Sequence, residues 1–331
     1  MTTAVFAAVP LPATGPPAGR VVGSAAGSAS PDRAGIVEGI ASWVDSPAMT
    51  ALLDEFGGGS RPGPLGDRLD ALEEFSARWD HRKGLLERHQ VVGESFAAPV
   101  DARIRSAARS LGLAGRVMPR SRSFDHILVL GGGVRTMMAR AHLAATILRR
   151  GVRAGSVAGL GSLRPIPEQN VIAGGLGLGD VATEGDAVDE ALRYAFGAAP
   201  ATERRSGTTE AGQPWWVRSH PDVDPPVHVL AAPSTRPGER ANTADTLLGW
   251  AELVRSASVG TRLLVVTTDI FVPFQHCDAV RLLGLRYGCE VETVGFDSTA
   301  NRWVPPPATS AILQEVRSAI RSMQALYRAV A

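Results

Sequence analysis

One segment limits the folds open to this chain more than any other. The apolar run of residues 127–130 (ILVL) leads directly into the glycine triplet 131–133. A short, continuous apolar run is typical of a strand that is buried on both faces of a parallel sheet. Apolar residues then recur at spacings of four, three and four over residues 137–148, which is the spacing of a helix. The sequence therefore predicts a strand, a glycine turn and a helix in succession.

The same order of elements recurs toward the C-terminus. An apolar run at 227–230 precedes a predicted helix at 243–254, and a second run at 263–266 precedes a predicted helix near 278–285. A further strand is expected at 290–294, and a long amphipathic helix closes the chain. Strands that alternate with helices indicate an α/β fold with a doubly wound, mostly parallel sheet.

The first third of the chain has a different character. Residues 1–33 are rich in Ala, Gly, Ser and Pro, which predicts a disordered arm. Helical spacing predicts a helical subdomain over 34–120, and the α/β domain is expected over 121–331. Trp43 and Trp79 are expected either in the core or against a second copy, which would make these helices the contact of a homodimer. The expected helices are 34–56 (interrupted at Pro47), 67–89 and 101–113.

The net charge of the chain limits the classes of function that we expect for it. Lys and Arg total 34 against 33 Asp and Glu, a net charge of +1. A binder of nucleic acid or of an anionic membrane that relies on bulk charge would carry a larger excess, so we expect neither partner. Every basic residue except Lys83 is arginine. Codon bias in a GC-rich genome and a need for groups that grip anions would both produce this preference.

Cysteine use and hydropathy bear on the compartment. Two cysteines are too few for a disulfide framework or a thiolate metal cage. No window approaches the roughly 20 apolar residues of a membrane span, and the N-terminus lacks the basic segment of a secretory signal. We therefore expect a cytoplasmic protein without a membrane anchor.

Ligands of open α/β sheets bind beyond the carboxyl ends of the strands. After the first strand lie Gly131, Gly132, Gly133 and Arg135. Glycines let the main chain approach a ligand, and the start of the following helix favours an anion. The same glycines could serve only the geometry of a tight turn. The dinucleotide fingerprint fails, because Thr136 stands at its third glycine position and no acid follows the next strand.

Other loops supply further polar candidates. We expect Asp269 and Glu184 to be catalytic, as groups for proton transfer. Asn242 could instead cap a helix, Asp269 could cap a turn, and Glu184 or Glu168 could be a solvated surface acid. The remaining ligand-binding candidates are Arg164, Glu168, Arg236, Arg240, Asn242, Thr243, Thr267, Thr268 and Gln275. A metal site is not expected, because the adjacent residues 276–278 (HCD) would point different ways on a helix.

Four segments follow one another along the chain: FDHILVLGGG, TEGDAV, RANTADTL and LLVVTTDIFVPFQ. Over about residues 124–296 this order resembles the DUF218 family, the YdcF/SanA/ElyC-like proteins. The resemblance implies a Rossmann-like fold, with the family's glycine turn at 131–133 and its acid at Glu184. It also places the family's Asn-Thr pair at Asn242-Thr243 and its Thr-Ser pair at Thr267-Thr268. S-adenosylmethionine or a nucleotide as ligand is implied by the resemblance alone.

The chain departs from that family's pattern at several places. Thr246 stands where the family has a second asparagine, and the family's arginine has no clear counterpart. Phe271 stands where the family has a histidine, and an insertion at 198–226, which contains Trp215-Trp216, enlarges one loop. The sequence favours a cytosolic enzyme of small-molecule, specialised metabolism that acts on a nucleotide-like or phosphorylated ligand. Group transfer is favoured, by a transferase or hydrolase rather than an oxidoreductase. The alternative is a non-catalytic small-molecule-binding or regulatory protein on the same fold, which Phe271 favours.

Overall fold

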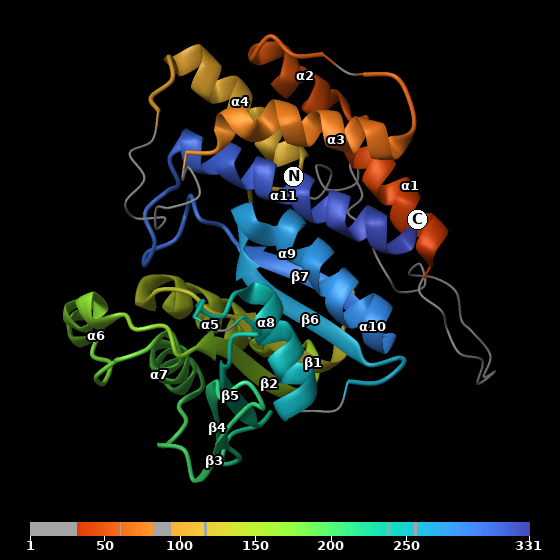
Figure 1. Ribbon diagram of the computed structural model, residues 1–331. Helices are drawn as coiled ribbons and strands as arrows, with labels where there is room; N and C mark the ends of the chain where they lie inside the picture. Colours follow the sequence, from red (N-terminus) through yellow and green to blue (C-terminus); the bar gives the residue numbers. More distant parts are fainter. Residues whose placement is uncertain (1–31, 60, 82–93, 116–117, 237, 255–256) are drawn as a thin grey trace.

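A seven-stranded sheet forms the centre of the protein (Figure 1). The computed structural model describes residues 32–59, 61–81, 94–115, 118–236, 238–254 and 257–331. The strand order is β3-β4-β5-β2-β1-β6-β7, in which the last five strands are parallel and β3 and β4 are antiparallel. The strands are β1 Ser123–Leu130, β2 Arg153–Ser162, β3 Glu203–Thr208, β4 Pro214–His220, β5 Val227–Ala232, β6 Arg262–Thr268 and β7 Glu290–Phe296.

The central strand β1 alternates between two cores, as the two-residue period of a strand requires. Ile127 and Val129 pack with the helices α5 (Val134–Arg149) and α7 (Glu184–Phe196). Leu128 and Leu130 belong to the core on the opposite face. That face is covered by α8 (Thr243–Gly249), α9 (Val272–Ala279) and α11 (Thr309–Val330). The expected α/β, Rossmann-like, doubly wound and mostly parallel sheet is confirmed.

The N-terminal helices form a layer against α11 (Figure 1). These helices are α1 Arg33–Val44, α2 Pro47–Glu55, α3 Leu65–Ser76 and α4 Ala98–Ser110. Trp43 and Trp79 lie buried in the core of this layer, and the Trp43 indole donates to the Leu111 carbonyl at 3.0 Å. Because α11 shares that core, the helical layer draws on both ends of the described chain. The division at residue 120 stays a prediction.

Several predicted helix bounds differ from the structure. The helix expected over 67–89 is α3 followed by a 3₁₀ turn, Ala77–Trp79. Its predicted continuation falls on 82–93, which lie outside the described residues. The predicted arm also lies outside them, except for its last two residues. The helix expected near 278–285 begins earlier, as α9, and continues as a π-helix, Val280–Gly284. The helix expected at 243–254 is α8 followed by a second π-helix, Trp250–Val254. The short helices α6 (Asn170–Gly175) and α10 (Leu285–Tyr287) complete the set.

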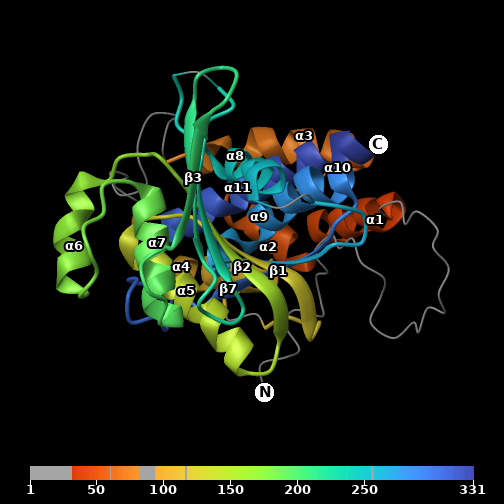
Figure 2. The same cartoon turned by 90° about the horizontal axis from the view of Figure 1, so that it is seen from below.

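The insertion at 198–226 is a β-hairpin, where the sequence predicted an enlarged loop. Strands β3 and β4 pair antiparallel, and β4 joins the sheet through β5. In Figure 2 this hairpin projects past the neighbouring helices. Strand β3 is mostly exposed and polar on both faces, so it lacks the apolar alternation by which a strand is recognised.

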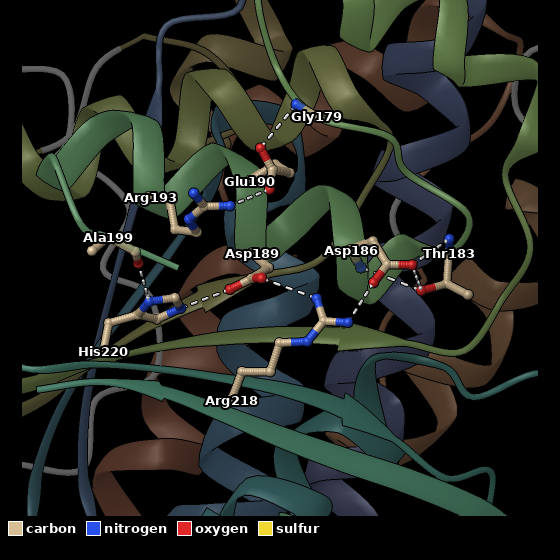
Figure 3. A network of polar contacts seen from close by, with 9 residues as sticks. All are labelled: Gly179, Thr183, Asp186, Asp189, Glu190, Arg193, Ala199, Arg218 and His220. Carbon is tan, nitrogen blue, oxygen red and sulfur yellow. Dashed lines mark hydrogen bonds and ion pairs between the residues drawn. The ribbon is translucent and has the colours of Figure 1, made fainter. Parts of the chain in front are cut away.

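A buried ionic network fastens the hairpin to α7 (Figure 3). Arg218 on β4 bonds Asp189 at 2.9 Å and Asp186 at 3.0 Å. His220, which is 0% exposed, lies 2.7 Å from the same Asp189 through Nε2 and 2.9 Å from the Ala199 carbonyl through Nδ1. Both ring nitrogens therefore face acceptors, so the protonated ring can donate to both of them.

We predict that this network makes stability depend on pH above 6.5. Burial lowers the pKa of His220, but the hydrogen bonds to Asp189 and the Ala199 carbonyl raise it by more, so it lies above the ordinary 6.5. A raised histidine pKa stabilises the fold fully below 6.5, and the stabilisation is lost as the pH rises through the folded-state value. Urea denaturation across about pH 6 to 9 should show the free energy of unfolding falling in that direction.

The variant His220→Gln isolates the contribution of the ring. It should lower the free energy of unfolding at about pH 6 by about 3 kcal/mol, because Asp189 and Arg218 lose a buried charged partner. Its stability should also respond less to pH. His228→Gln is the control, since the His228 ring on β5 contacts the Ser219 hydroxyl at 3.0 Å. Equal pH slopes in wild type and His220→Gln would contradict the prediction.

Candidate functional site

A cavity of about 560 Å³ opens at the carboxyl edge of the sheet, where the adjacent strands β5, β2, β1 and β6 end. This is the place at which ligands of open α/β sheets bind. Its lining includes Leu130, Gly131, Gly132, Gly133, Thr136, Arg140, Leu160, Arg164, Gln169, Glu184, Arg240, Ala241, Asn242, Thr243, Thr246, Phe271, Phe274, Gln275 and Ser318.

Much of the predicted site is gathered here. The residues of the sequence prediction that line the cavity are Gly131, Gly132, Gly133, Arg164, Glu184, Arg240, Asn242, Thr243 and Gln275. They come from loops after three different strands and from the first turns of α7, α8 and α9. Their convergence follows from the topology, because the carboxyl ends of neighbouring parallel strands meet at one edge. That they bind a ligand stays a prediction.

Two of the three glycines have protein atoms close to where a side chain would begin, a main-chain oxygen at Gly131 and the end of a side chain at Gly133. A Cβ on Gly131 would stand 2.6 Å from the Leu160 carbonyl oxygen of β2. A Cβ on Gly133 would stand 2.8 Å from Oε1 of Gln169, whose amide oxygen accepts from the Val134 N–H at 2.7 Å. Gly132 has more room, since its nearest contact would be the Thr136 methyl at 3.2 Å. The tight-turn explanation therefore accounts for the outer two glycines.

Glu184 is placed by the start of α7. Thr183 caps this helix, and its side chain and that of Asp186 form a reciprocal capping box. The Ser162 hydroxyl at the end of β2 donates to Glu184 Oε2 at 2.6 Å, and Arg164 lies 3.6 Å from Oε1. Glu184 is thus fixed in direction by two side chains.

Arg140 lines the cavity and was not among the residues that the sequence predicted. Its side chain is 2% exposed and lies at the floor of the cavity. The guanidinium donates to the carbonyls of Leu130, at 2.8 Å, and Gly131, and to the Thr268 hydroxyl at 3.1 Å. A signal was present in the sequence, because Arg140 stands three residues after Met137 and four before Ala144, on the apolar stripe of the predicted helix.

Other predicted ligand residues lie outside the lining of the cavity. Arg135 contacts the Trp303 carbonyl at 3.4 Å, and Glu168 is exposed. Arg236 is exposed and pairs with Glu239 at 2.8 Å. Thr267 and Thr268 are buried behind residues that line the cavity. Thr267 donates to Gln275, and Thr268 accepts from Arg140.

Asp269, the predicted base, also lies outside the cavity lining. Its carboxylate is 1% exposed and accepts main-chain N–H groups of Gly115 at 3.2 Å, Ile270 at 2.8 Å and Ser298 at 3.0 Å. Burial raises the pKa of Asp269 to about 6, against the opposing effect of these hydrogen bonds. Those three donors hold the carboxylate where the ends of β6 and β7 meet the segment that precedes β1.

Neither a metal centre nor a membrane span is found in the described part of the chain. No group of three or more His, Cys, Asp or Glu side chains there could hold a metal ion. His276 contacts the Thr293 hydroxyl at 3.0 Å, and burial raises the pKa of the enclosed Cys277 thiol. Among the helices of the described ranges, none is both long and apolar enough to cross a bilayer.

Comparisons with known proteins point to mycobacterial relatives. Residues 27–112 match the family described as the Rv3785 N-terminal domain. Over 329 residues the chain is 30% identical to the uncharacterized protein Rv3785 of Mycobacterium tuberculosis strain H37Rv, covering 89% of this chain and 90% of the relative. The uncharacterized protein Mb3814 of Mycobacterium bovis matches to the same extent. No solved structure matches this chain.

The expected DUF218 membership is wrong, because the family and relatives that match are those of Rv3785. The misleading motifs consist of strand ends, turns and helix caps, which the order of elements in an α/β sheet produces in unrelated families. S-adenosylmethionine as ligand, and the comparison of Phe271 with a family histidine, rested on that resemblance and lose their support.

The glycine turn yields a prediction with its own control. Gly131→Ala should lower the free energy of unfolding by about 2 kcal/mol, because the new methyl group must displace the Leu160 carbonyl. Gly132→Ala should cost much less, since a side chain can move away from it. Thermal and chemical denaturation of both variants would measure the difference. Equal destabilisation would show that the Leu160 carbonyl does not constrain the turn.

Proposed function

This chain belongs to the Rv3785 family, and from the chemistry of its cavity we propose that it binds a phosphorylated or nucleotide-like small molecule and catalyses group transfer on it. One observation carries the proposal. Three arginines, Arg140, Arg164 and Arg240, line one cavity together with a single carboxylate, Glu184, among the described lining residues. The excess of positive charge suits an anionic ligand, and guanidinium groups match phosphate oxygens with paired hydrogen bonds.

The three arginines of the cavity differ in their exposure to solvent. Arg140 is buried at the floor, Arg164 has a side chain 25% exposed, and Arg240 is exposed. A buried cation in a low-dielectric floor attracts an anion over a longer range than an exposed one.

Asn242 caps α8, as the sequence allowed, since its Oδ1 accepts from the N–H groups of Ala244 and Asp245. Its amide NH₂ and the Thr243 hydroxyl can hydrogen-bond a ligand. A volume of about 560 Å³ lies within the range of small-molecule sites.

Glu184 is the group to which we assign proton transfer. It is the carboxylate of the described lining residues, and Ser162 and Arg164 hold it in place. A general base must stand within hydrogen-bonding reach of the proton that it takes. Asp269, which accepts three main-chain N–H groups away from the cavity lining, does not meet that condition here.

A non-catalytic binding or regulatory protein is the second candidate. The described residues that line the cavity include no histidine, cysteine or lysine, which are frequent nucleophiles and proton carriers. The aromatic pair Phe271 and Phe274, with ring centroids 5.8 Å apart, gives the cavity an apolar wall suited to holding a ligand. Detection of turnover with a bound phosphate ester would reject this candidate.

The setting of this function is also part of the proposal. We place the protein in the cytoplasm, in small-molecule and specialised metabolism, with its small-molecule ligand as its main partner and without nucleic acid. Cys277 and Cys289 form no disulfide, which suits a reducing compartment. A homodimer through the N-terminal helices would have to use surfaces other than Trp43 and Trp79, which the chain's own core buries.

Calorimetric titration with inorganic phosphate, ribose 5-phosphate and adenosine monophosphate tests the proposed function. We expect at least one of the two esters to bind. Arg240→Gln should weaken that binding about tenfold, the effect of losing one hydrogen bond to a charged group. Arg236→Gln, a matched exposed arginine of the same loop that does not line the cavity, should leave it unchanged. Absence of binding by all three probes would reject the proposal.

A further inference from the structure

The helical layer, which Figure 1 shows above the sheet, contains a second cavity of about 270 Å³. It shares no described lining residue with the cavity at the sheet edge. Its described lining includes three arginines, Arg61, Arg68 and Arg78, and neither aspartate nor glutamate. A cavity that is lined by cations without a carboxylate favours an anion.

This cavity forms where the loop after α2 crosses one side of α3. Arg68 and Phe75 lie two turns apart on α3, and Arg78 follows one turn later in the 3₁₀ turn, so the three share that side. The main chain of Gly58 lies against Phe75, because a Cβ there would stand 2.4 Å from the ring. The glycine triplet 57–59 therefore lets the loop approach α3 closely without filling the space with side chains.

The protein already uses part of this positive charge. Arg68 forms an ion pair with Asp45, so that pair contributes little net charge. Arg78 donates to the carbonyls of Phe56 at 2.9 Å and Phe75 at 3.0 Å. These neutral acceptors take two of the five N–H groups of the guanidinium and do not offset its charge.

Arg61 differs from both of these arginines. It is exposed, follows the glycine triplet in the same loop, and has no hydrogen bond or ion pair with the described part of the chain. Arg61 and Arg78 thus give the cavity two cations that no carboxylate of the described lining balances. Two guanidinium groups around a small space match an anion with several oxygen atoms.

The size and the apolar wall of the cavity limit what this anion can be. A volume of about 270 Å³ lies just below the range of drug-sized ligand sites, so a small anion fits it better than a nucleotide does. Val44, Leu53 and Leu72 supply buried apolar side chains to the wall. The Arg78 guanidinium lies 3.8 Å from the centroid of the Phe75 ring, a cation–π contact that restrains its direction.

We propose that this cavity binds a small oxyanion, a phosphate or a short carboxylate, between Arg61 and Arg78. The apolar wall accommodates the carbon atoms of a small organic anion. The site lies apart from the cavity at the sheet edge, and the proposal does not depend on the function that we propose for that cavity.

Calorimetric titration with inorganic phosphate and with succinate tests the site, and the two probes distinguish a phosphate from a carboxylate ligand. At least one of them should bind the wild-type chain. Arg61→Gln should weaken that binding about tenfold, the effect of losing one hydrogen bond to a charged group. Thermal denaturation of this variant should match wild type, because Arg61 has no partner to lose in the described part of the chain. Arg109→Gln, an exposed arginine of the same layer outside the cavity lining, is the matched control and should bind as wild type does.

Nitrogen-15 NMR of the arginine Nε–H groups locates the bound probe. The Arg78 resonance, identified by its absence from the variant Arg78→Lys, should shift as the probe is added. A resonance of Arg78 that stays in place while the probe saturates the chain would overturn the proposal.

Phosphate could also bind at the sheet edge, and Arg240→Gln separates the two cavities. Binding that weakens with Arg61→Gln and persists with Arg240→Gln belongs to the helical layer and supports the proposal. If neither probe binds, or if all binding survives Arg61→Gln, the proposal is rejected. Equal weakening by Arg109→Gln would also reject it, since it would show attraction to the surface charge alone. The titrations with ribose 5-phosphate and adenosine monophosphate judge the proposed function separately.

Discussion

The carboxyl edge of the sheet depends on the hydrogen bonds that the buried Arg140 guanidinium donates. A charge in the interior is costly unless its donors are met. Here the donors meet the carbonyls of Leu130 and Gly131 at the end of β1 and the Thr268 hydroxyl at the end of β6. These are the groups that a strand leaves unpaired where its ladder stops. One side chain from α5 therefore ties two strand ends together and lets a cavity open above them.

The walls of that cavity follow from close contacts of the main chain. Gly131 brings β1 within reach of the Leu160 carbonyl, and Gly185 on α7 leaves no room for a side chain between the helix and Trp216. This close packing of α7 fixes the position of Glu184, the first residue of the helix. One turn further along, the same face of the helix is held by the network of Asp189, Arg218 and His220. The position of the cavity's carboxylate is thus fixed by contacts that two successive turns of α7 make with β4.

The sequence predicted the architecture well because the parallel strands are continuous apolar runs between glycine turns. Nine of its fifteen candidate residues line the cavity, since strand ends of a parallel sheet converge. It could not show what partners distant in sequence decide. Asp269 is drawn to N–H groups of Gly115 and Ser298, Arg140 is hidden within a helical pattern, and the polar strand β3 shows no alternation. The family assignment failed because short motifs of turns and caps carry little information beyond the fold.

The placement of α11 has a consequence for how the chain is made. The helices α1, α3 and α4 pack on α11, yet α11 leaves the ribosome after every strand of the sheet. The apolar faces of these early helices, with Trp43 and Trp79, must therefore remain without their final partner while the whole sheet is synthesised. Assembly of the helical layer then follows synthesis of the sheet, and it joins elements that the sheet separates in the sequence.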